Sequence, residues 1–380
     1  MGAWSRGQQW VATVGATATA MGFALATRRI YGSFWKQPDA SWYLLLARGK
    51  GSEVIQPFAS RQLYALSVRG LAAVLGWPVG RAFVAVGVVC LVFTLAVIFR
   101  LMVRTGAPRW MLGAAAVLPF WPQMLAGLVL PDIWYAALLA VLLLLLERRW
   151  WWAAAAMMLP LMVSRESTSL TLVCLLLAGW RELRWPRAAF AVLCTGAGGW
   201  IVHALTAGGP GNSEKLPQAV YLLAKVPWNG MRNLLGIQPW SNLYPFLCQR
   251  PRWLWAVHLG PVRALGVCSV NGMEPVMALI AEVTVFGVLP ALAIVLWWRQ
   301  RGQREDVLLR FCVLYGGLGF LLAPVLGTAV GRLVGYGWPL PLVAAPILAG
   351  RLSGGWRAGG LLAAHFALCL LALVAARGWL

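Results

Sequence analysis

Long apolar runs separated by short clusters of arginine constrain this chain more than any other feature. A membrane span needs about 20 apolar residues, with a range of roughly 17 to 25. The sequence contains about eleven candidate spans, at approximately 9–27, 82–103, 110–129, 132–146, 150–164, 167–181, 188–206, 276–298, 307–326, 333–350 and 357–376. It therefore predicts an all-α, polytopic membrane bundle that forms one domain over residues 1–380.

The composition favours the same class of protein. Of the residues, 61% are hydrophobic and 11% are charged, whereas soluble domains are about 45–50% apolar and about 25% charged. The net charge of +21 would suit a nucleic-acid-binding protein only if it lay on one soluble face. Here the arginines alternate with apolar runs, and tryptophan, which prefers membrane interfaces, occurs 23 times. We therefore expect contacts with a lipid bilayer and none with nucleic acid.

Every second connection between the expected spans is rich in arginine. The clusters are Arg100, Arg104 and Arg109; Arg148 and Arg149; Arg181, Arg184 and Arg187; Arg299, Arg301 and Arg304; and Arg351 and Arg357. By the positive-inside rule these connections and the N-terminus face the cytoplasm. The other connections, including the long segments 28–81 and 207–275, then lie outside. The excess of arginine over lysine is typical of a GC-rich bacterial gene, and we expect the protein in a bacterial inner membrane.

Several acidic residues fall on the expected outer side, at or near the ends of spans. They are Asp39, Glu53, Asp132, Glu166, Glu214 and Glu274. A charge near the bilayer centre costs at least about 2.5–3.5 kcal/mol, so a carboxylate held near the bundle is a functional candidate. We take Asp39, Asp132 and Glu166 as candidate catalytic residues. Structural roles are also open: Asp39 and Asp132 could cap helices, and Glu166 could form an ion pair between helices.

Basic residues on the same side are candidates for binding a phosphate, because guanidinium groups bind phosphate oxygens in pairs. We expect this role for Arg61, Arg332, Arg165, Lys215 and Lys225. Glycines at 327, 331 and 335 recur every four residues, a spacing that lets membrane helices pack closely. Residues 60–77 have apolar positions at helical spacing, which predicts a helix in the membrane interface.

The sequence contains no P-loop, no HExxH and no GxSxG. Any chemistry should therefore use a donor that is already in the membrane. Cys248 and Cys268 share a long polar loop and would pair in an oxidising compartment; the sequence leaves this pairing open.

Together these residues resemble the GT-C superfamily of integral-membrane glycosyltransferases, and especially its small bacterial members. The likeness is carried by Asp39, Tyr43, Ala47, Arg48 and Arg61 in the first outer segment, by Pro131 and Asp132, by Arg165, Glu166 and Ser167, and by Arg332 through Tyr336 to Pro339. It implies a GT-C-like bundle with interfacial helices in the first outer loop. It also implies a polyprenyl-phosphate-linked sugar as donor and a lipid, glycan or protein acceptor on the outer face.

The resemblance also implies roles for single residues. Asp39 matches the catalytic base of the family, and Tyr43, Arg48 and Tyr336 belong to its substrate pocket. Transfer would be an inverting single displacement if one base acts without a nucleophile. The larger family members carry a soluble outer C-terminal domain that this chain lacks, so we expect segment 207–275 to recognise the acceptor.

Two other classes of protein fit the same residues. A transporter or flippase for a lipid-linked sugar would need the same arginine and lysine residues on the outer side but no catalytic base. A non-catalytic partner in a polysaccharide assembly complex would need neither. A divalent metal could bind the oxygens of Asp39, Asp132 and Glu166. Arginine and lysine alone can stabilise a monophosphate leaving group, so we expect no metal and no other cofactor.

Overall fold

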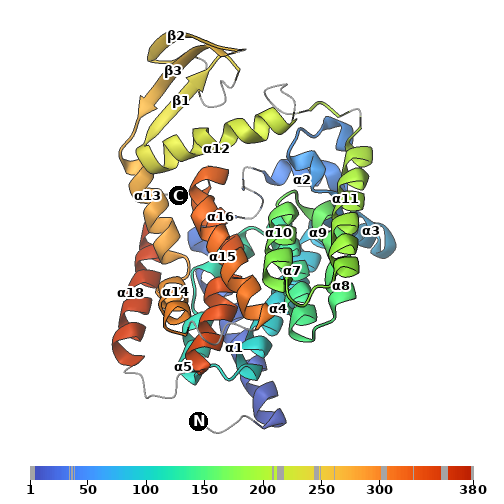
Figure 1. Ribbon diagram of the computed structural model, residues 1–380, viewed down its shortest axis with the longest axis vertical. Coiled ribbons are helices and arrows are strands. Elements are labelled where there is room, and N and C mark those ends of the chain that lie inside the picture. The colour runs from blue at the N-terminus through green and yellow to red at the C-terminus, as the bar shows by residue number, and fades with distance from the viewer. Residues whose placement is uncertain are drawn as a thin grey trace.

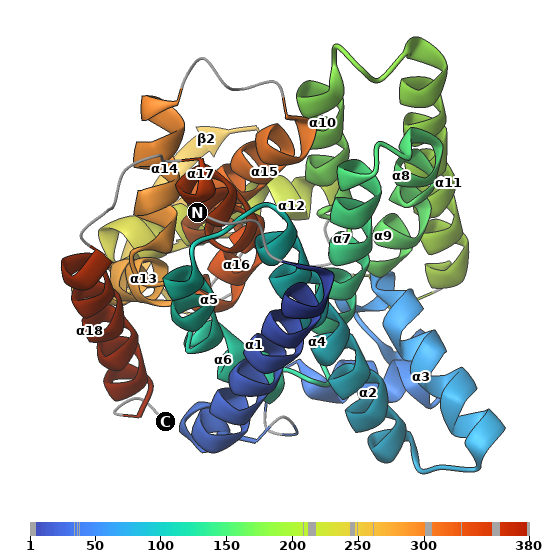
Figure 2. The same ribbon diagram turned by 90° about the horizontal axis from the view of Figure 1, so that it is seen from below.

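The computed structural model describes residues 5–33, 35, 37, 39–207, 209–211, 218–243, 248, 250–260, 262–300, 306–327, 329–351 and 358–377. This part of the chain is mostly helical, and a small sheet lies at one end of the molecule (Figure 1). Viewed from below, α7 to α11 lie together on one side, and α13, α14 and α18 lie on the other (Figure 2).

Five of the described helices are long and apolar enough to span a membrane. They are α1 (Arg6–Thr27), α4 (Val79–Arg104), α11 (Trp185–Thr206), α15 (Val307–Leu326) and α18 (Ala358–Arg377). Two bent helix pairs raise the number to seven if each pair forms one span. The protein therefore has the helices of a polytopic membrane protein.

The first bent pair consists of α13 (Met273–Thr284) and α14 (Leu289–Arg299), at an angle of 66°. Gly287, with a φ of 56°, lies at the break, and Pro290 follows without a backbone N–H to continue the ladder. The second pair bends by 41° between α16 (Val330–Val334) with η5 (Gly335–Gly337) and η6 (Leu340–Ala344) with α17 (Ala345–Gly350). Pro339 and Pro341 lie at this bend.

The structure does not confirm eleven spans. The run 110–129 forms two short helices, α5 (Arg109–Ala116) and α6 (Phe120–Ala126), because Pro119 precedes the second and interrupts the hydrogen-bond ladder. The next three expected spans are α7 (Pro131–Glu147), α8 (Trp151–Ala156) with α9 (Met158–Ser164), and α10 (Thr168–Gly179). The helical segment 151–164 and the 12-residue α10 are shorter than a usual span.

The prediction of an all-α fold is wrong in segment 207–275. After α12 (Gln218–Leu235), the chain forms the antiparallel strands β1 (Ile237–Ser241), β2 (Trp253–Leu259) and β3 (Val262–Val270), in the order β1-β3-β2. These strands are rich in tryptophan and valine, which favour sheets, and Gly260 takes a positive φ of 60° in the turn between β2 and β3. A disulfide joins Cys248 to Cys268, which resolves the pairing that the sequence left open.

The first long segment folds against the bundle. It contains η1 (Arg28–Tyr31), α2 (Ala40–Ala47), η3 (Gly51–Glu53), η4 (Phe58–Ser60) and α3 (Gln62–Leu75). The helix expected over 60–77 is therefore confirmed as α3. Tyr64, Ala65 and Val68 bury one of its faces, whereas Leu66 and Val74 remain exposed.

The arginine-bearing connections gather at one end of the bundle. A series of ion pairs joins them: Arg104 with Glu147 at 3.3 Å, Arg149 with Glu182 at 4.0 Å, Arg310 with Glu182 at 3.3 Å, and Arg351 with Asp306 at 3.5 Å. The sheet, α12 and α2 lie at the other end (Figure 1). The alternation of basic and less basic connections along the chain therefore corresponds to two opposite ends of the structure.

Candidate functional site

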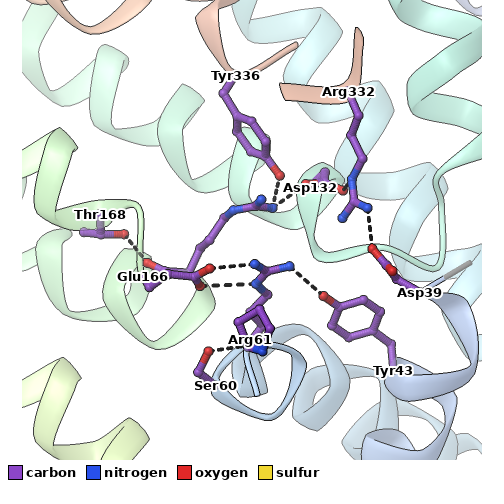
Figure 3. A network of polar contacts seen from close by, with 11 residues as sticks. Asp39, Tyr43, Ser60, Arg61, Asp132, Glu166, Thr168, Arg332 and Tyr336 are labelled. Atoms are coloured by element: carbon purple, nitrogen blue, oxygen red, sulfur yellow. Dashed lines mark hydrogen bonds and ion pairs between the residues drawn. The ribbon is translucent and has the colours of Figure 1, made fainter. Parts of the chain in front are cut away.

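Charged side chains from four separate parts of the chain meet at the end of the bundle that carries α2 (Figure 3). Asp39 directly precedes α2, and Asp132 lies in the first turn of α7, after Pro131 at the helix start. Arg165 and Glu166 occupy the turn between α9 and α10, and Arg332 comes from α16. All of these positions are helix ends or very short helices, where polar side chains can turn toward one another.

One polar network is centred on Arg332. Its Nη1 lies 2.6 Å from Oδ2 of Asp39, and its Nε lies 2.6 Å from Oδ2 of Asp132. The other oxygen of Asp132 accepts from Nη1 of Arg165 at 2.5 Å. Arg165 also donates to the hydroxyl of Tyr336, and its guanidinium lies 4.2 Å from the centre of that ring. Asp39 makes no capping hydrogen bond to α2, so binding Arg332 is its observed role.

A second network is centred on Arg61. Its Nη2 and Nε donate to the two oxygens of Glu166 at 2.6 and 3.2 Å, and its Nη1 donates to the hydroxyl of Tyr43 at 3.0 Å. Burial by itself would raise the pKa of Glu166, but the charge of Arg61 and these hydrogen bonds outweigh it and lower the pKa to about 2. Glu166 is therefore ionised at neutral pH and held in place.

The three candidate carboxylates differ in how many of their oxygens are already bound. Both oxygens of Asp132 and both oxygens of Glu166 accept hydrogen bonds from arginine. Among the described residues, Asp39 is bound through Oδ2 alone, which leaves Oδ1 uncommitted. Among the same described residues, Nη2 of Arg332 is buried and has no hydrogen-bond partner. An unused acceptor, Oδ1 of Asp39, and an unused donor, Nη2 of Arg332, thus lie on two side chains that are hydrogen-bonded to each other.

A cavity of about 620 Å³ lies beside this pair. Its polar lining includes Asp39, Asp132, Arg332 and Tyr336. Its apolar lining includes Phe120, Met124, Leu130, Ala136, Val330 and Trp338. Ligand sites usually measure about 300–1,000 Å³ and combine apolar walls with a few polar groups. The cavity therefore has the size and lining of a site for an amphipathic ligand.

A second cavity of about 300 Å³ lies beside the first. Both include Val330 and Gly331 of α16 in their lining. The second cavity also contacts Asn233, Arg232 and Glu274, and the latter two form an ion pair at 2.5 Å. Segment 207–275, which was expected to recognise an acceptor, therefore contributes to a cavity next to the charged network.

The structure brings together most of the residues expected at the site. These are Asp39, Tyr43, Arg61, Asp132, Arg165, Glu166, Arg332 and Tyr336. Arg48 is exposed at the end of α2, and Lys225 lies over the ring of Tyr221 on α12; neither lines the cavity. Lys215 lies outside the described residues.

Two arginines differ from their expected role as phosphate ligands. Arg61 and Arg165 are not among the residues that line the cavity. Arg61 is bound to Glu166, which does not line the cavity either, and Arg165 is bound to the lining residue Asp132. Of the three arginines, Arg332 alone is among the lining residues of the cavity.

The sequence prediction also missed residues of the cavity wall, notably Gln123, Phe120 and Trp338. Gln123 stands in the otherwise apolar run 110–129, and this isolated polar residue was the signal that could have indicated it.

The described residues contain no group of three or more His, Cys, Asp or Glu side chains placed to hold a metal ion. The oxygens of Asp132 and Glu166 that could ligate a cation are instead bound to arginine. Activity without a metal stays a prediction.

No protein-family model matches this chain, and neither the curated proteins nor the solved structures show a significant similarity to it.

Proposed function

We propose that this protein is a GT-C-type glycosyltransferase of a bacterial inner membrane. It transfers a sugar from a polyprenyl-phosphate donor to a lipid, glycan or protein acceptor on the outer face. One observation carries the proposal: the uncommitted Oδ1 of Asp39 and the uncommitted Nη2 of Arg332 occur together on residues that line one amphipathic cavity. A general base and an oxyanion donor are the two groups that sugar transfer from a phosphate requires.

In the proposed reaction, a hydroxyl of the acceptor attacks the anomeric carbon of the donor sugar, and Oδ1 of Asp39 takes its proton. The bond between the anomeric carbon and the phosphate oxygen breaks, and its electron pair remains on that oxygen. Nη2 of Arg332 donates a hydrogen bond to the developing charge. Because no enzyme nucleophile intervenes, the single displacement inverts the anomeric configuration.

The remaining charged residues act as positioning residues. Asp132 holds Arg332 and Arg165 at once, so it fixes the direction in which the guanidinium of Arg332 points. Arg61 binds Tyr43 of α2 and Glu166 of the turn between α9 and α10, and thereby connects α2 to that turn. These contacts keep α2, and therefore Asp39, against the bundle.

The lining of the cavity supports a prenyl donor. Apolar side chains such as Phe120, Met124 and Leu130 lie beside the charged groups, as a ligand with a prenyl chain and a phosphate head requires. The smaller cavity, with Asn233, Arg232 and Glu274, offers polar groups on the other side of α16. We assign it to the acceptor.

Two independent features support an outer location of the site. The arginine-bearing connections lie at the opposite end of the bundle, and such connections face the cytoplasm. The disulfide between Cys248 and Cys268 lies in the segment that carries the sheet, at the same end as α2. Disulfides persist in oxidising compartments such as the periplasm.

A flippase for a lipid-linked sugar is the second candidate function. The bent pair that begins at α16 lines the cavity, and interrupted helices around a binding site are typical of transporters. A flippase would bind the same donor without breaking the bond between sugar and phosphate.

The test uses the purified protein in liposomes with a panel of short-chain prenyl-phosphate sugars and simple glycoside acceptors. Mass spectrometry measures the released prenyl phosphate, and a fluorescent prenyl-phosphate sugar reports movement between leaflets. We expect the wild type to release prenyl phosphate and the Asp39→Asn variant to lose at least about a hundredfold in rate.

Glu53→Gln is the matched control. Glu53 belongs to the same outer segment, but it is exposed and pairs with Lys50 at 3.3 Å, so its neutralisation should leave the rate unchanged. Leaflet movement without release by the wild type would support the flippase and contradict the transferase.

A further inference from the structure

A separate cavity of about 390 Å³ lies at the arginine-rich end of the molecule. It is formed where the first turns of α1 meet the last turns of α4. The lining consists of Arg6, Gln9, Trp10, Thr13, Arg100 and Arg104. None of these residues belongs to the charged networks around Asp39.

The charges around this cavity are not balanced. Among the described residues, only Arg104 has a carboxylate partner, Glu147 at 3.3 Å. The guanidinium of Arg100 lies 5.4 Å from the centre of the Trp10 ring. Neither Arg100 nor Arg6 forms an ion pair with a carboxylate of the described residues. The cavity therefore has three guanidinium groups and one carboxylate, which binds only Arg104. The site at the other end has three arginines and three carboxylates.

The geometry points to a binding site for the phosphate of an anionic ligand, either the head group of an anionic phospholipid or a soluble phosphate monoester. Guanidinium groups bind phosphate oxygens in pairs. Two unpaired positive charges can neutralise the single charge of a phospholipid phosphodiester or the charge of about −1.5 to −2 on a phosphate monoester. Both α1 and α4 are candidate spans, so their ends lie at the level of lipid head groups. Trp10 is suited to the same level, because indole prefers the membrane interface.

Arg148 provides a matched comparison. It lies over Trp150 at 5.2 Å, at the same end of the bundle, but does not line this cavity. A general attraction between this end and any anionic surface would involve Arg148 as much as Arg100. Binding of a ligand in this cavity would depend on Arg100 and Arg6 but not on Arg148.

The experiment measures ligand binding to the delipidated, detergent-solubilised full chain. Native mass spectrometry titrates phosphatidylglycerol against phosphatidylcholine, and thermal unfolding with inorganic phosphate tests the soluble source. The variants are Arg100→Gln, Arg6→Gln as a second variant in case the first fails to fold, and Arg148→Gln as the control. One arginine near a membrane surface contributes about 1 kcal/mol, so each cavity variant should bind about fivefold more weakly, and Arg148→Gln should bind like the wild type.

Each source has its own outcome. Preferential binding of phosphatidylglycerol that depends on Arg100 or Arg6 assigns the site to a lipid head group. Stabilisation by inorganic phosphate with the same dependence, and no preference between the lipids, assigns it to a soluble phosphate. If neither ligand depends on Arg100 or Arg6, or if Arg148→Gln weakens binding equally, the proposal is overturned.

Discussion

Nη1 of Arg332 lies 2.6 Å from Oδ2 of Asp39, although 293 positions separate the two residues in the chain. The same guanidinium binds Asp132 through Nε. One planar group therefore joins the first outer segment, the start of α7 and α16. Because these contacts connect distant parts of the sequence, the site is complete only when most of the bundle has folded.

Replacing Arg332 by lysine keeps the charge but removes the planar fork. A lysine ammonium carries its three N–H groups on one nitrogen, whereas Arg332 uses separate nitrogens for Asp132 and Asp39. Lysine therefore cannot keep both contacts in place and also direct an N–H group into the cavity. We expect kcat/KM for the donor to fall at least about tenfold, a loss of about 1.4 kcal/mol in transition-state stabilisation. Initial rates of prenyl phosphate release over a range of donor concentrations measure it.

Arg149→Lys is the control for this substitution. Arg149 is exposed at the other end of the bundle and lies 4.0 Å from Glu182, so the exchange should leave the rate unchanged. An Arg332→Lys protein with wild-type donor affinity and turnover would show that the fork has no part in the reaction.

The two aspartates that bind Arg332 should differ in their effect on stability. Among the residues that the structure describes, Asp132 is the only carboxylate bound to Arg165, whose side chain is 7% exposed. Asp132→Asn removes it, and an uncompensated buried charge costs about 3–5 kcal/mol. Asp39→Asn should cost about 1 kcal/mol or less, because Asp39 is 25% exposed and Arg332 keeps its contact with Asp132. Thermal unfolding of both variants in the same detergent measures the difference, and equal destabilisation would contradict the assignment of roles.

The ion pair between Glu166 and Arg61 should make stability depend on pH in the acid range. Arg61 lowers the pKa of Glu166 to about 2 in the folded protein, whereas the pKa of unfolded glutamate is about 4.3. The contribution of this carboxylate is therefore complete above about pH 4.5 and is lost as the pH falls toward 2. With a side chain that is 31% exposed, the stabilisation should be on the order of 2 kcal/mol.

The measurement compares the unfolding temperatures of the wild type and Glu166→Gln from pH 2 to 7. We expect a constant gap above about pH 5 that narrows toward pH 2. A gap that stays constant throughout would mean that the ionised form of Glu166 contributes nothing.

Close packing between α15 and the bent pair that carries Arg332 depends on Gly316. A Cβ atom there would lie 2.4 Å from Cβ of Leu340, in η6, and 2.6 Å from its backbone nitrogen. Gly317 offers a matched control, because a Cβ atom there meets nothing within 4 Å. We expect Gly316→Ala to destabilise the protein by about 1–3 kcal/mol and Gly317→Ala to have little effect, as measured by thermal unfolding.

The parts of the structure that depend on apolar run length and on arginine position could be predicted from the sequence. The long helices α1, α4, α11, α15 and α18 were expected, and so was the gathering of the basic connections at one end. The meeting of Asp39, Asp132, Glu166 and Arg332 could also be predicted, because all of them lie at span ends on one side. Pattern and topology were sufficient for these features.

Other features depend on contacts that a pattern does not encode. The sequence predicted close helix packing at glycines 327, 331 and 335, where a Cβ atom would lie 3.0, 3.4 and 3.2 Å from its nearest neighbour. Closer approaches occur at Gly316 and Gly337, at 2.4 and 2.5 Å, because η5 and η6 bend against α15. It could not show that Arg61 and Arg165 would be occupied by carboxylates, since that depends on side-chain direction. The sheet was missed because its strands lie in a long segment between spans, where the hydropathy pattern is weak.

The rate of sugar transfer by Asp39→Asn tests the central claim most directly. Asparagine keeps the size of the side chain and one oxygen that can accept from Arg332, but it cannot act as a general base. With expression, unfolding temperature and donor binding close to those of the wild type, the proposed mechanism predicts that prenyl phosphate release falls at least about a hundredfold. Release by Asp39→Asn at a near wild-type rate would contradict the account.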